Sequence, residues 1–235
     1  MILINDNCHA LGASYYNDKK YAMKFSDFVV HSYHAVKNIT TAEGGAIFIK
    51  NSDNFKKLRI LREHGFEQND KRNPFNYNLK QIGFNFRLSD LNCGLGISQL
   101  SRIDSIIKKR DYYSKFYDKY FINNNLVETP KREKNKKSSY HLYNIRINFD
   151  KLNISKLKFF KIMKKKYKIN LQVHYTPTYK FSLYKKYLSS LKDFQNTEEY
   201  YKQTFSLPLY LDLSKKNIKY VANSINYLTK KYNNV

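Results

Sequence analysis

The chain has 235 residues, of which 42% are hydrophobic, and it carries a formal net charge of +24. This length and composition are enough for a buried core in one large domain or two smaller ones, which excludes an intrinsically disordered chain. The sequence lacks an apolar run of the roughly 18 to 20 residues that span a bilayer, and no basic segment precedes an apolar one. We therefore expect a cytoplasmic protein without a membrane partner.

The two cysteines, Cys8 and Cys93, lie among apolar or small residues and lack the spacing of metal ligands. Such cysteines usually act as small buried hydrophobic residues. We expect neither a disulfide framework nor a metal site.

The positive charge is compatible with nucleic-acid binding, but the lysines spread through the whole chain. They are densest at residues 131–137 and 156–168. In the second segment Leu157, Phe160 and Met163 recur at helical spacing between lysines, a pattern typical of a helix with a solvated basic face. We therefore expect no nucleic-acid partner, although a basic nucleic-acid-binding protein remains an alternative.

Short apolar runs bounded by polar residues or glycine predict strands at residues 1–5, 27–33 and 44–50, an arrangement compatible with an α/β sheet. The next segment predicts a helix that is capped by Ser52 and stopped by Gly65.

Residues 88–121 predict one long, bent helix that begins at the Ser89 cap. Gly94 and Gly96 inside it suggest close packing against a neighbouring element, because a helical glycine otherwise costs about 1 kcal/mol relative to alanine.

Beyond residue 125 the pattern changes to that of a separate α+β unit. Strands are predicted at 141–149 and 169–175, a basic helix between them, and a last helix at 217–232 that begins near Ser214. One face of this last helix carries Ile218, Val221, Ala222, Ile225 and Leu228. We expect two domains, residues 1–125 and 126–235.

Polar side chains follow the first two predicted strands. Asp6 follows the first strand, and Ser32, His34 and Lys37 follow the second. Ligands of α/β folds bind at the ends of strands, and an amine, a carboxylate and a hydroxyl are what pyridoxal phosphate needs. Spacing alone leaves open that Lys37 is an ordinary surface lysine.

Four ordered motifs carry a stronger signal. They are "DNCHALGASY" at 6–15, "SYHAVKNITTAEGGAIF" at 32–48, "REHG" at 62–65 and "GFNFRLSDLNCGLGISQL" at 83–100. Together they resemble the sugar aminotransferases of the DegT/DnrJ/EryC1/StrS family. The resemblance implies the fold-type I architecture of enzymes that use pyridoxal 5′-phosphate: an α/β fold comprising the C-terminal part of the large domain and a small α+β domain.

Motifs of the C-terminal part are similar to one branch of this family. They are "SSYHLYNI" at 138–145, "LQVHYTPTYKFSLYKKY" at 171–187 and "EEYYKQTFSLPLY" at 198–210. That branch transfers an amino group to the C4 keto group of a UDP-linked 4-keto-6-deoxy-N-acetyl-hexosamine in pseudaminic acid biosynthesis. The resemblance therefore implies a nucleotide-sugar substrate and an amino donor such as glutamate.

The resemblance also implies roles for individual residues. Lys37 becomes the Schiff-base lysine and proton shuttle, Asp6 the partner of the pyridinium nitrogen, and His9 a contact of the ring or its phenolic oxygen. Ser32 is expected to bind the phosphate, and Asn85 to reach the cofactor of a neighbouring subunit, which implies a homodimer. Helix capping by Asp6, packing of His9 and turn formation by Asn85 are the alternatives.

His141, Tyr143, His174 and Tyr175 are expected to contact the substrate or the donor from the small domain. The alternative is that these aromatic residues pack between strands. Compared with the family, the chain lacks roughly the first 150 residues, which would contain the glycine-rich phosphate loop and the aromatic residue that stacks on the ring. We expect a fragment of an aminotransferase; a catalytically inactive remnant is the alternative.

Overall fold

A computed structural model describes residues 1–68, 72–73, 75–187 and 190–233. The chain forms two compact units, the first made of residues 1–107 and 134–139 and the second of residues 108–133 and 140–235. A domain boundary at residue 125 stays a prediction, because the units are defined by contacts and not by independent folding. Among the described residues, no helix is both long and apolar enough to cross a bilayer.

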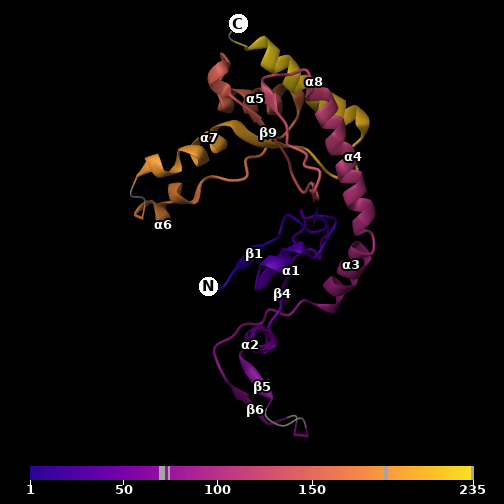
Figure 1. Ribbon diagram of the computed structural model, residues 1–235, viewed down its shortest axis with the longest axis vertical. Coiled ribbons are helices and arrows are strands. Elements are labelled where there is room, and N and C mark those ends of the chain that lie inside the picture. Colours follow the sequence, from indigo (N-terminus) through magenta and orange to yellow (C-terminus); the bar gives the residue numbers. More distant parts are fainter. Residues whose placement is uncertain (69–71, 74, 188–189, 234–235) are drawn as a thin grey trace. The chain divides into compact units, whose positions relative to one another are not determined.

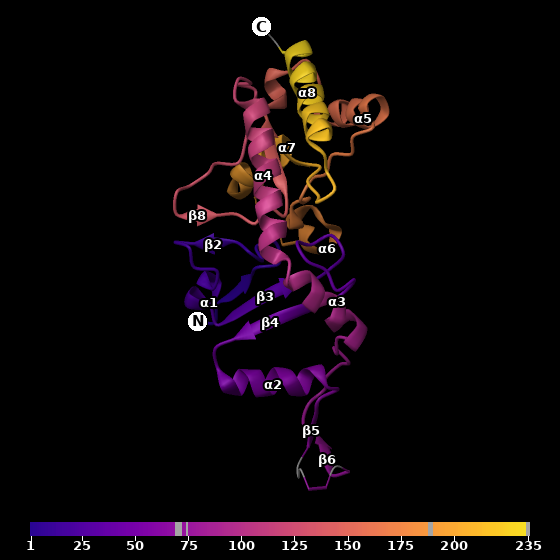
Figure 2. The same cartoon turned by 90° about the vertical axis from the view of Figure 1, so that its right-hand side faces the viewer.

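The first unit is built on a three-stranded sheet in the order β1-β3-β4 (Figure 2). Its strands are β1 (Ile4–Asp6), β3 (Phe28–Ser32) and β4 (Gly45–Ile49), which confirms the three strands expected from the sequence. β1 pairs in parallel with β3, and β4 runs antiparallel to β3. The remaining elements are β2 (Ser14–Tyr15), α1 (Tyr21–Phe25), α2 (Ser52–Arg62), β5 (Phe66–Gln68), β6 (Tyr77–Leu79), α3 (Asp90–Leu100) and β8 (Lys136–Lys137).

The N-cap of helix α2 lies one residue earlier than the sequence predicted. The N-cap is Asn51, whose Oδ1 accepts the backbone N–H groups of Asp53 and Asn54, each at 2.9 Å, so the assignment of Ser52 as the cap is wrong. Gly65 follows the helix with a positive φ of 86°, and a Cβ atom there would collide with the carbonyl oxygen of Gln81. The predicted glycine stop therefore reflects both conformation and close approach.

The long helix predicted at 88–121 is two helices, α3 and α4 (Ile103–Phe121). The Ser89 cap is confirmed, since its Oγ accepts the N–H of Asn92. The break lies at Ser101 and Arg102, whose hydroxyl and Nε donate to the Ser98 carbonyl at 2.9 Å and 3.3 Å. The backbone N–H of Arg102 bonds Gln99 instead, so side chains compete with the helical hydrogen-bond ladder at this point.

The two glycines of α3 differ in their surroundings. A Cβ atom on Gly96 would lie 2.8 Å from Cγ2 of Thr41, a buried residue, whereas one on Gly94 would meet nothing within 4 Å. The close packing expected from the sequence is therefore confirmed at Gly96, and within the described residues it is wrong at Gly94.

We expect Gly96→Ala to destabilise the chain and Gly94→Ala, its matched control, to stabilise it. Gly94→Ala should raise the free energy of unfolding by about 1 kcal/mol, because alanine is the better helix former and meets no neighbour. Gly96→Ala should lose that gain and more through the overlap with Thr41. Urea unfolding of both variants measures the difference, and equal effects would contradict the packing of Gly96.

The second unit carries a sheet of order β10-β9-β7 with helices packed against it. Its elements are the C-terminal part of α4, β7 (Val127–Glu128), β9 (Tyr143–Ile147), α5 (Lys156–Tyr167), α6 (Ser182–Lys185), α7 (Gln195–Gln203), β10 (Thr204–Leu207) and α8 (Lys215–Lys231), with short 3₁₀ helices at Phe149–Lys151, Thr178–Lys180 and Leu191–Phe194. The strand and the last helix expected at 141–149 and 217–232 are confirmed.

The largest cluster of buried apolar residues lies in this second unit. The ring of Tyr117 on α4 stacks on that of Tyr143 at 4.9 Å, and Phe159 on α5 packs on Phe205 of β10 at 6.0 Å. All five apolar residues expected on the last helix are buried, and Ser214 caps its start. Of the three apolar residues expected to recur on α5, Met163 is buried and Phe160 packs partly buried against the core, but Leu157 is exposed and Phe159 lies on the inner face instead.

A regular strand at 169–175 was predicted but is wrong. Gln172 alone pairs with β10, through reciprocal backbone bonds with Ser206 of 3.4 and 2.8 Å. Alternating apolar residues do predict an extended chain here, but a single bridge does not make a ladder.

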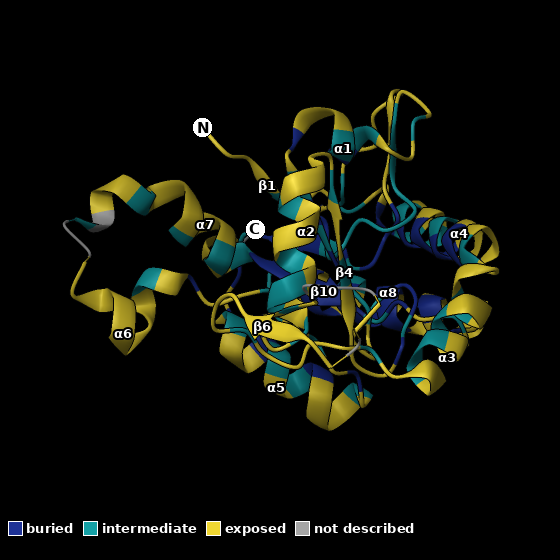
Figure 3. Cartoon of the chain, turned by 90° about the horizontal axis from the view of Figure 1, so that it is seen from below, coloured by how far each residue is buried: buried dark blue, intermediate teal, exposed yellow. Residues whose placement is uncertain are grey.

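The sheet of the first unit is less well covered than that of the second (Figure 3). Val29 is 2% exposed, but Ile4 is 64%, Ile47 51% and Phe48 47% exposed. This uncovered apolar surface, which includes residues 1–3, is unusual for an independently stable sheet.

Candidate functional site

Asp6 lies at the carboxyl end of β1, where its side chain is exposed. Its Oδ1 accepts the backbone N–H of Cys8 at 3.1 Å. Hydrogen bonds from the Cys8 thiol and then from this N–H lower the pKa of Asp6, and the charges of His9 and Lys37 lower it further. The carboxylate is therefore ionised at neutral pH, and it lies within electrostatic range of Lys37.

Cys8 supports this carboxylate and is not itself a nucleophile. Burial, followed by the hydrogen bond to Asp6, raises the pKa of the Cys8 thiol to about 11. A thiol with such a pKa stays protonated at neutral pH, and its proton is shared between Asp6 and the Val30 carbonyl oxygen, which lies 3.7 Å from Sγ.

Ser32 ends β3 on the same edge of the sheet, because β1 and β3 run parallel with Asp6 opposite Val30. The Ser32 Oγ accepts the backbone N–H of His34 at 3.3 Å. Accepting this bond leaves the hydroxyl hydrogen to donate, as a phosphate oxygen requires. Asp6 and Ser32 thus lie at neighbouring strand ends, as the sequence predicted.

Lys37 lies in a closed loop between β3 and β4. The Tyr33 carbonyl accepts the Thr41 N–H at 2.9 Å and the Thr40 hydroxyl at 3.2 Å, while the Tyr33 N–H donates to Gly44 at 2.8 Å. These bonds join the two ends of the loop and so limit the movement of Lys37.

The residues after Lys37 anchor the loop. Ile39 is 3% exposed, and the buried Asn38 donates its side-chain amide to the Leu11 carbonyl at 3.1 Å. The Lys37 N–H donates to the His34 carbonyl at 2.9 Å, and its side chain is half-buried. A fixed backbone next to a lysine side chain is what a covalent cofactor attachment requires.

A buried polar cluster behind the strand ends was missed by sequence reasoning. Asn7 Nδ2 lies 3.3 Å from His31 Nε2, and the Tyr21 hydroxyl donates to Asn7 Oδ1 at 3.1 Å. Burial lowers the pKa of His31, so its imidazole is neutral at physiological pH. The signal available in the sequence was that Asn7 follows an apolar run and His31 interrupts one. In the structure the two side chains hold the ends of β1 and β3 together.

The structure places His9 and Asn85 but does not test the cofactor contacts predicted for them. His9 follows the Asp6 turn, and its carbonyl accepts the Ser139 hydroxyl at 2.9 Å. Asn85 is exposed; its Oδ1 accepts the Arg87 N–H at 3.3 Å, and its backbone bridges to Glu63. Both therefore remain predictions, and turn formation by Asn85 is part of what the structure shows.

His141 belongs to the second unit, where its backbone is fixed before β9. Arg110, which is buried on α4, donates from Nη1 to the carbonyls of Tyr140, His141 and Leu209 at 3.0, 3.2 and 3.2 Å. A contact of the His141 side chain with substrate stays a prediction.

Tyr143 packs inside the second unit. It is 0% exposed, and its hydroxyl donates to Asp118 Oδ1 at 2.6 Å. Burial, followed by this hydrogen bond, raises the pKa of Tyr143. The geometry favours the packing alternative for this residue.

We expect Tyr143→Phe to lower the free energy of unfolding by about 1.5 to 3 kcal/mol, because it removes a hydrogen bond to a charged acceptor. Tyr175→Phe is the control, since Tyr175 is 65% exposed. Chemical unfolding compares the two variants, and an unchanged Tyr143→Phe would show that the hydroxyl does not stabilise the core.

His174 and Tyr175 lie in the extended segment next to β10. His174 Nδ1 is 3.0 Å from the Ser206 hydroxyl. The rings of His174 and Tyr175 meet edge to face, with their centres 4.8 Å apart. Tyr175 points enough of its ring to solvent to contact a ligand, so its predicted role stays open.

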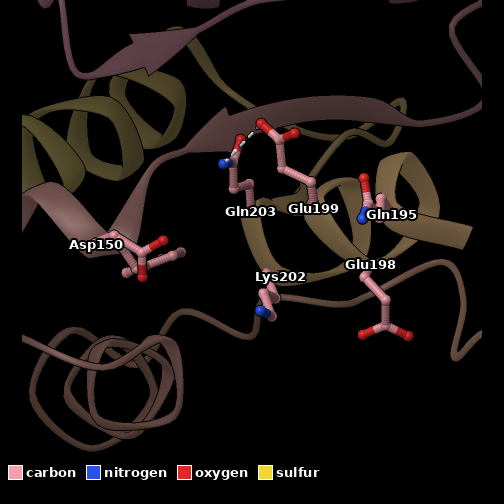
Figure 4. Close-up of a pocket in the computed structure, with 7 residues that line it drawn as sticks. Asp150, Gln195, Glu198, Glu199, Lys202 and Gln203 are labelled. Carbon is pink, nitrogen blue, oxygen red and sulfur yellow. Dashed lines mark hydrogen bonds between the residues drawn. The ribbon is translucent and has the colours of Figure 1, made fainter. Parts of the chain in front are cut away.

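The second unit also contains a cavity of about 250 Å³ beside α7 (Figure 4). Three of its polar side chains already have partners: Gln203 and Glu199 are hydrogen bonded at 3.3 Å, and Glu198 accepts Tyr179 at 2.6 Å and pairs with Lys180 at 2.7 Å. None of the predicted site residues lines it. No group of His, Cys, Asp and Glu in the described chain could hold a metal ion.

The first-unit residues fit pyridoxal phosphate by their chemistry. An ionised carboxylate suits a protonated ring nitrogen, a hydroxyl suits the phosphate, and an anchored lysine suits the aldehyde carbon. These three residues would hold the ring nitrogen, the phosphate and the aldehyde carbon of the cofactor.

Relatives with curated names match almost the whole chain. The UDP-4-amino-4,6-dideoxy-N-acetyl-β-L-altrosamine transaminase of Campylobacter jejuni is 40% identical over 95% of this chain, and the enzyme of that name from Helicobacter pylori is 33% identical over 94%. The chain spans 57% of the length of each of these relatives.

Solved structures of aminotransferases also match almost the whole chain. Helicobacter pylori PseC, an aminotransferase involved in pseudoaminic acid biosynthesis, superposes with a TM-score of 0.86 at 32% identity, covering 97% of this chain and 60% of that one. The PMP form of the sugar aminotransferase Spr1654 of Streptococcus pneumoniae gives 0.88 at 25% identity, covering 98% and 59%. Because residues 1–226 also match the family as a whole, the chain belongs to the DegT/DnrJ/EryC1/StrS aminotransferase family, whose cofactor is pyridoxal 5′-phosphate.

Proposed function

We propose that the protein to which this chain belongs transfers an amino group to the C4 keto group of a UDP-linked 4-keto-6-deoxy-N-acetyl-hexosamine. Glutamate is the donor we infer, and surface-glycan biosynthesis is the setting. The observation that carries the proposal is the 40% identity, over 95% of this chain, to a transaminase named after a UDP-linked 4-amino-4,6-dideoxy-N-acetyl sugar, the kind of product that this transfer would form.

The chain's own residues would divide the work between them. Bound pyridoxal phosphate supplies an electron sink for the carbon that loses or gains a proton. Asp6 would keep the ring nitrogen protonated, since its lowered pKa keeps the carboxylate charged. Lys37 Nζ would hold the cofactor, and it would move the proton between the cofactor and the reacting carbon of the donor or the sugar. The loop fixes the Lys37 backbone for both roles. Ser32 would orient the phosphate.

We further propose a homodimer and a further covering segment as requirements for activity. Asn85 lies among exposed apolar side chains, with Phe84 62% and Phe86 67% exposed. A partner subunit that covers these rings would bring Asn85 to its own cofactor, and a segment that covers Ile4, Ile47 and Phe48 would complete the sheet.

The experiment separates the two half-reactions of the complete protein. Glutamate should convert the cofactor from its aldehyde to its amine form with release of 2-oxoglutarate, and the UDP-4-keto sugar should then restore the aldehyde form and yield an amino sugar, seen by absorbance and mass spectrometry. Release of no oxo acid would favour the inactive-remnant alternative. Turnover with a different keto sugar alone would contradict the substrate class.

A further inference from the structure

Helices α5 and α8 of the second unit lie side by side (Figure 1), and a basic groove runs between them. Lysines are six of the twelve residues of α5 and five of the seventeen of α8, and neither helix contains an acidic residue. Two adjoining shallow depressions of about 280 and 570 Å³, both open to solvent, run along it and share Lys166 and Tyr227. The groove is lined by Lys158, Lys161, Lys165, Lys166, Lys216, Lys219 and Lys231.

These lysines are held apart from the negative charges of the chain. Both helices bury their apolar faces, through Phe159 and Met163 on α5 and Ile218 and Ile225 on α8, which turns the lysines outward. Within the described residues, none of the seven groove lysines makes an ion pair, whereas Lys180 on another part of the unit pairs with Glu198 at 2.7 Å. A rigid surface with this unbalanced charge attracts anions.

Tyrosine rings line the groove between the lysines, and lysines lie over three of the four rings. Lys166 Nζ lies 5.5 Å from the ring centre of Tyr167 and 5.9 Å from that of Tyr227, and Lys231 lies 5.5 Å from that of Tyr232. Nucleic-acid bases need free aromatic faces for stacking, so the three covered rings leave single-stranded nucleic acid few stacking positions in this groove. Lipid headgroup phosphates need only the ammonium groups, and tyrosine suits the membrane interface.

We propose that the α5–α8 groove is a peripheral docking surface for an anionic phospholipid membrane. It is independent of the proposed catalytic function, because it uses none of the residues assigned to catalysis. This proposal replaces the earlier expectation of no membrane partner. That expectation rested on the lack of a membrane-spanning segment, which says nothing about binding through a charged surface.

The test is flotation of the full chain with vesicles of phosphatidylcholine alone or mixed with phosphatidylglycerol, at about 0.15 M salt. Flotation leaves aggregated protein at the bottom of the gradient. The groove variant carries Lys158→Gln, Lys161→Gln, Lys166→Gln and Lys231→Gln. The control variant loses the same charge elsewhere, through Lys56→Gln, Lys57→Gln, Lys185→Gln and Lys186→Gln.

The chain should float with the mixed vesicles only. The groove variant should bind about 100-fold more weakly and the control variant within about twofold of the parent, since each lysine near an anionic surface contributes substantially. Circular dichroism should show both variants folded. Equal losses in the two variants, flotation with neutral vesicles, or no flotation would overturn the proposal. The proposal would also be overturned if a single-stranded oligonucleotide displaced the vesicles from the chain and bound the groove variant more weakly than the parent.

Discussion

Lys37→Ala is expected to abolish amino transfer by the complete protein, with a fall in rate of about 10³-fold or more. The variant removes the amine that holds the cofactor and moves the proton. It leaves Asp6 and Ser32 unchanged at the adjoining strand ends, so the cofactor should still bind noncovalently. Rates of 2-oxoglutarate release measure the first effect, and equilibrium dialysis of pyridoxal phosphate measures the second.

Lys57→Ala is the matched control, because Lys57 is an exposed lysine of the same unit on α2. It should leave both the rate and the cofactor affinity unchanged. A Lys37→Ala enzyme that keeps more than a few per cent of the parent rate would show that another residue moves the proton.

The second large effect is expected in the amide exchange of the chain on its own. β1 and β4 should exchange much faster than β9 and β10, because Ile4, Ile47 and Phe48 stand in water. At about 25 cal/mol per Å² of apolar surface, a few hundred Å² left uncovered offsets most of the usual 5 to 15 kcal/mol of stability. The apolar surface should also bind a dye such as ANS.

Supplying the covering segment, as part of one longer chain or as a separate one, should slow exchange in β1 and β4 by orders of magnitude. Exchange in β9 and β10 is the internal reference, since these strands are buried in their own unit. Equal protection of both sheets in the chain alone, together with cooperative melting and full activity, would contradict this account.

Elements with a clear period were predictable from the sequence. Helix α8 follows from apolar residues at helical spacing behind a serine cap, and β3 and β9 follow from short apolar runs. The breaks were not predictable, because they depend on local competition. The α3–α4 break needs the side chains of Ser101 and Arg102 to take the Ser98 carbonyl, and α2 is capped by Asn51 although Ser52 is also a good cap.

The candidate site was predictable to different depths. Asp6 and Ser32 follow from the position of polar residues at parallel strand ends, and the structure places them there. Lys37 needed the family resemblance, since one lysine among many carries no local signal. The burial of Tyr143 and the support from His31 depend on contacts between segments distant in the sequence, which periodicity does not reveal.

The most direct test of the central claim, that Lys37 holds the cofactor, is borohydride reduction of the complete protein with pyridoxal phosphate, followed by peptide mass spectrometry. Reduction converts the bond between lysine and cofactor into a stable one, so the modified peptide identifies the lysine. The account predicts one pyridoxyl group per chain, on the peptide that contains Lys37, and loss of the label in Lys37→Ala. A label on another lysine, or one that persists in Lys37→Ala, would contradict it.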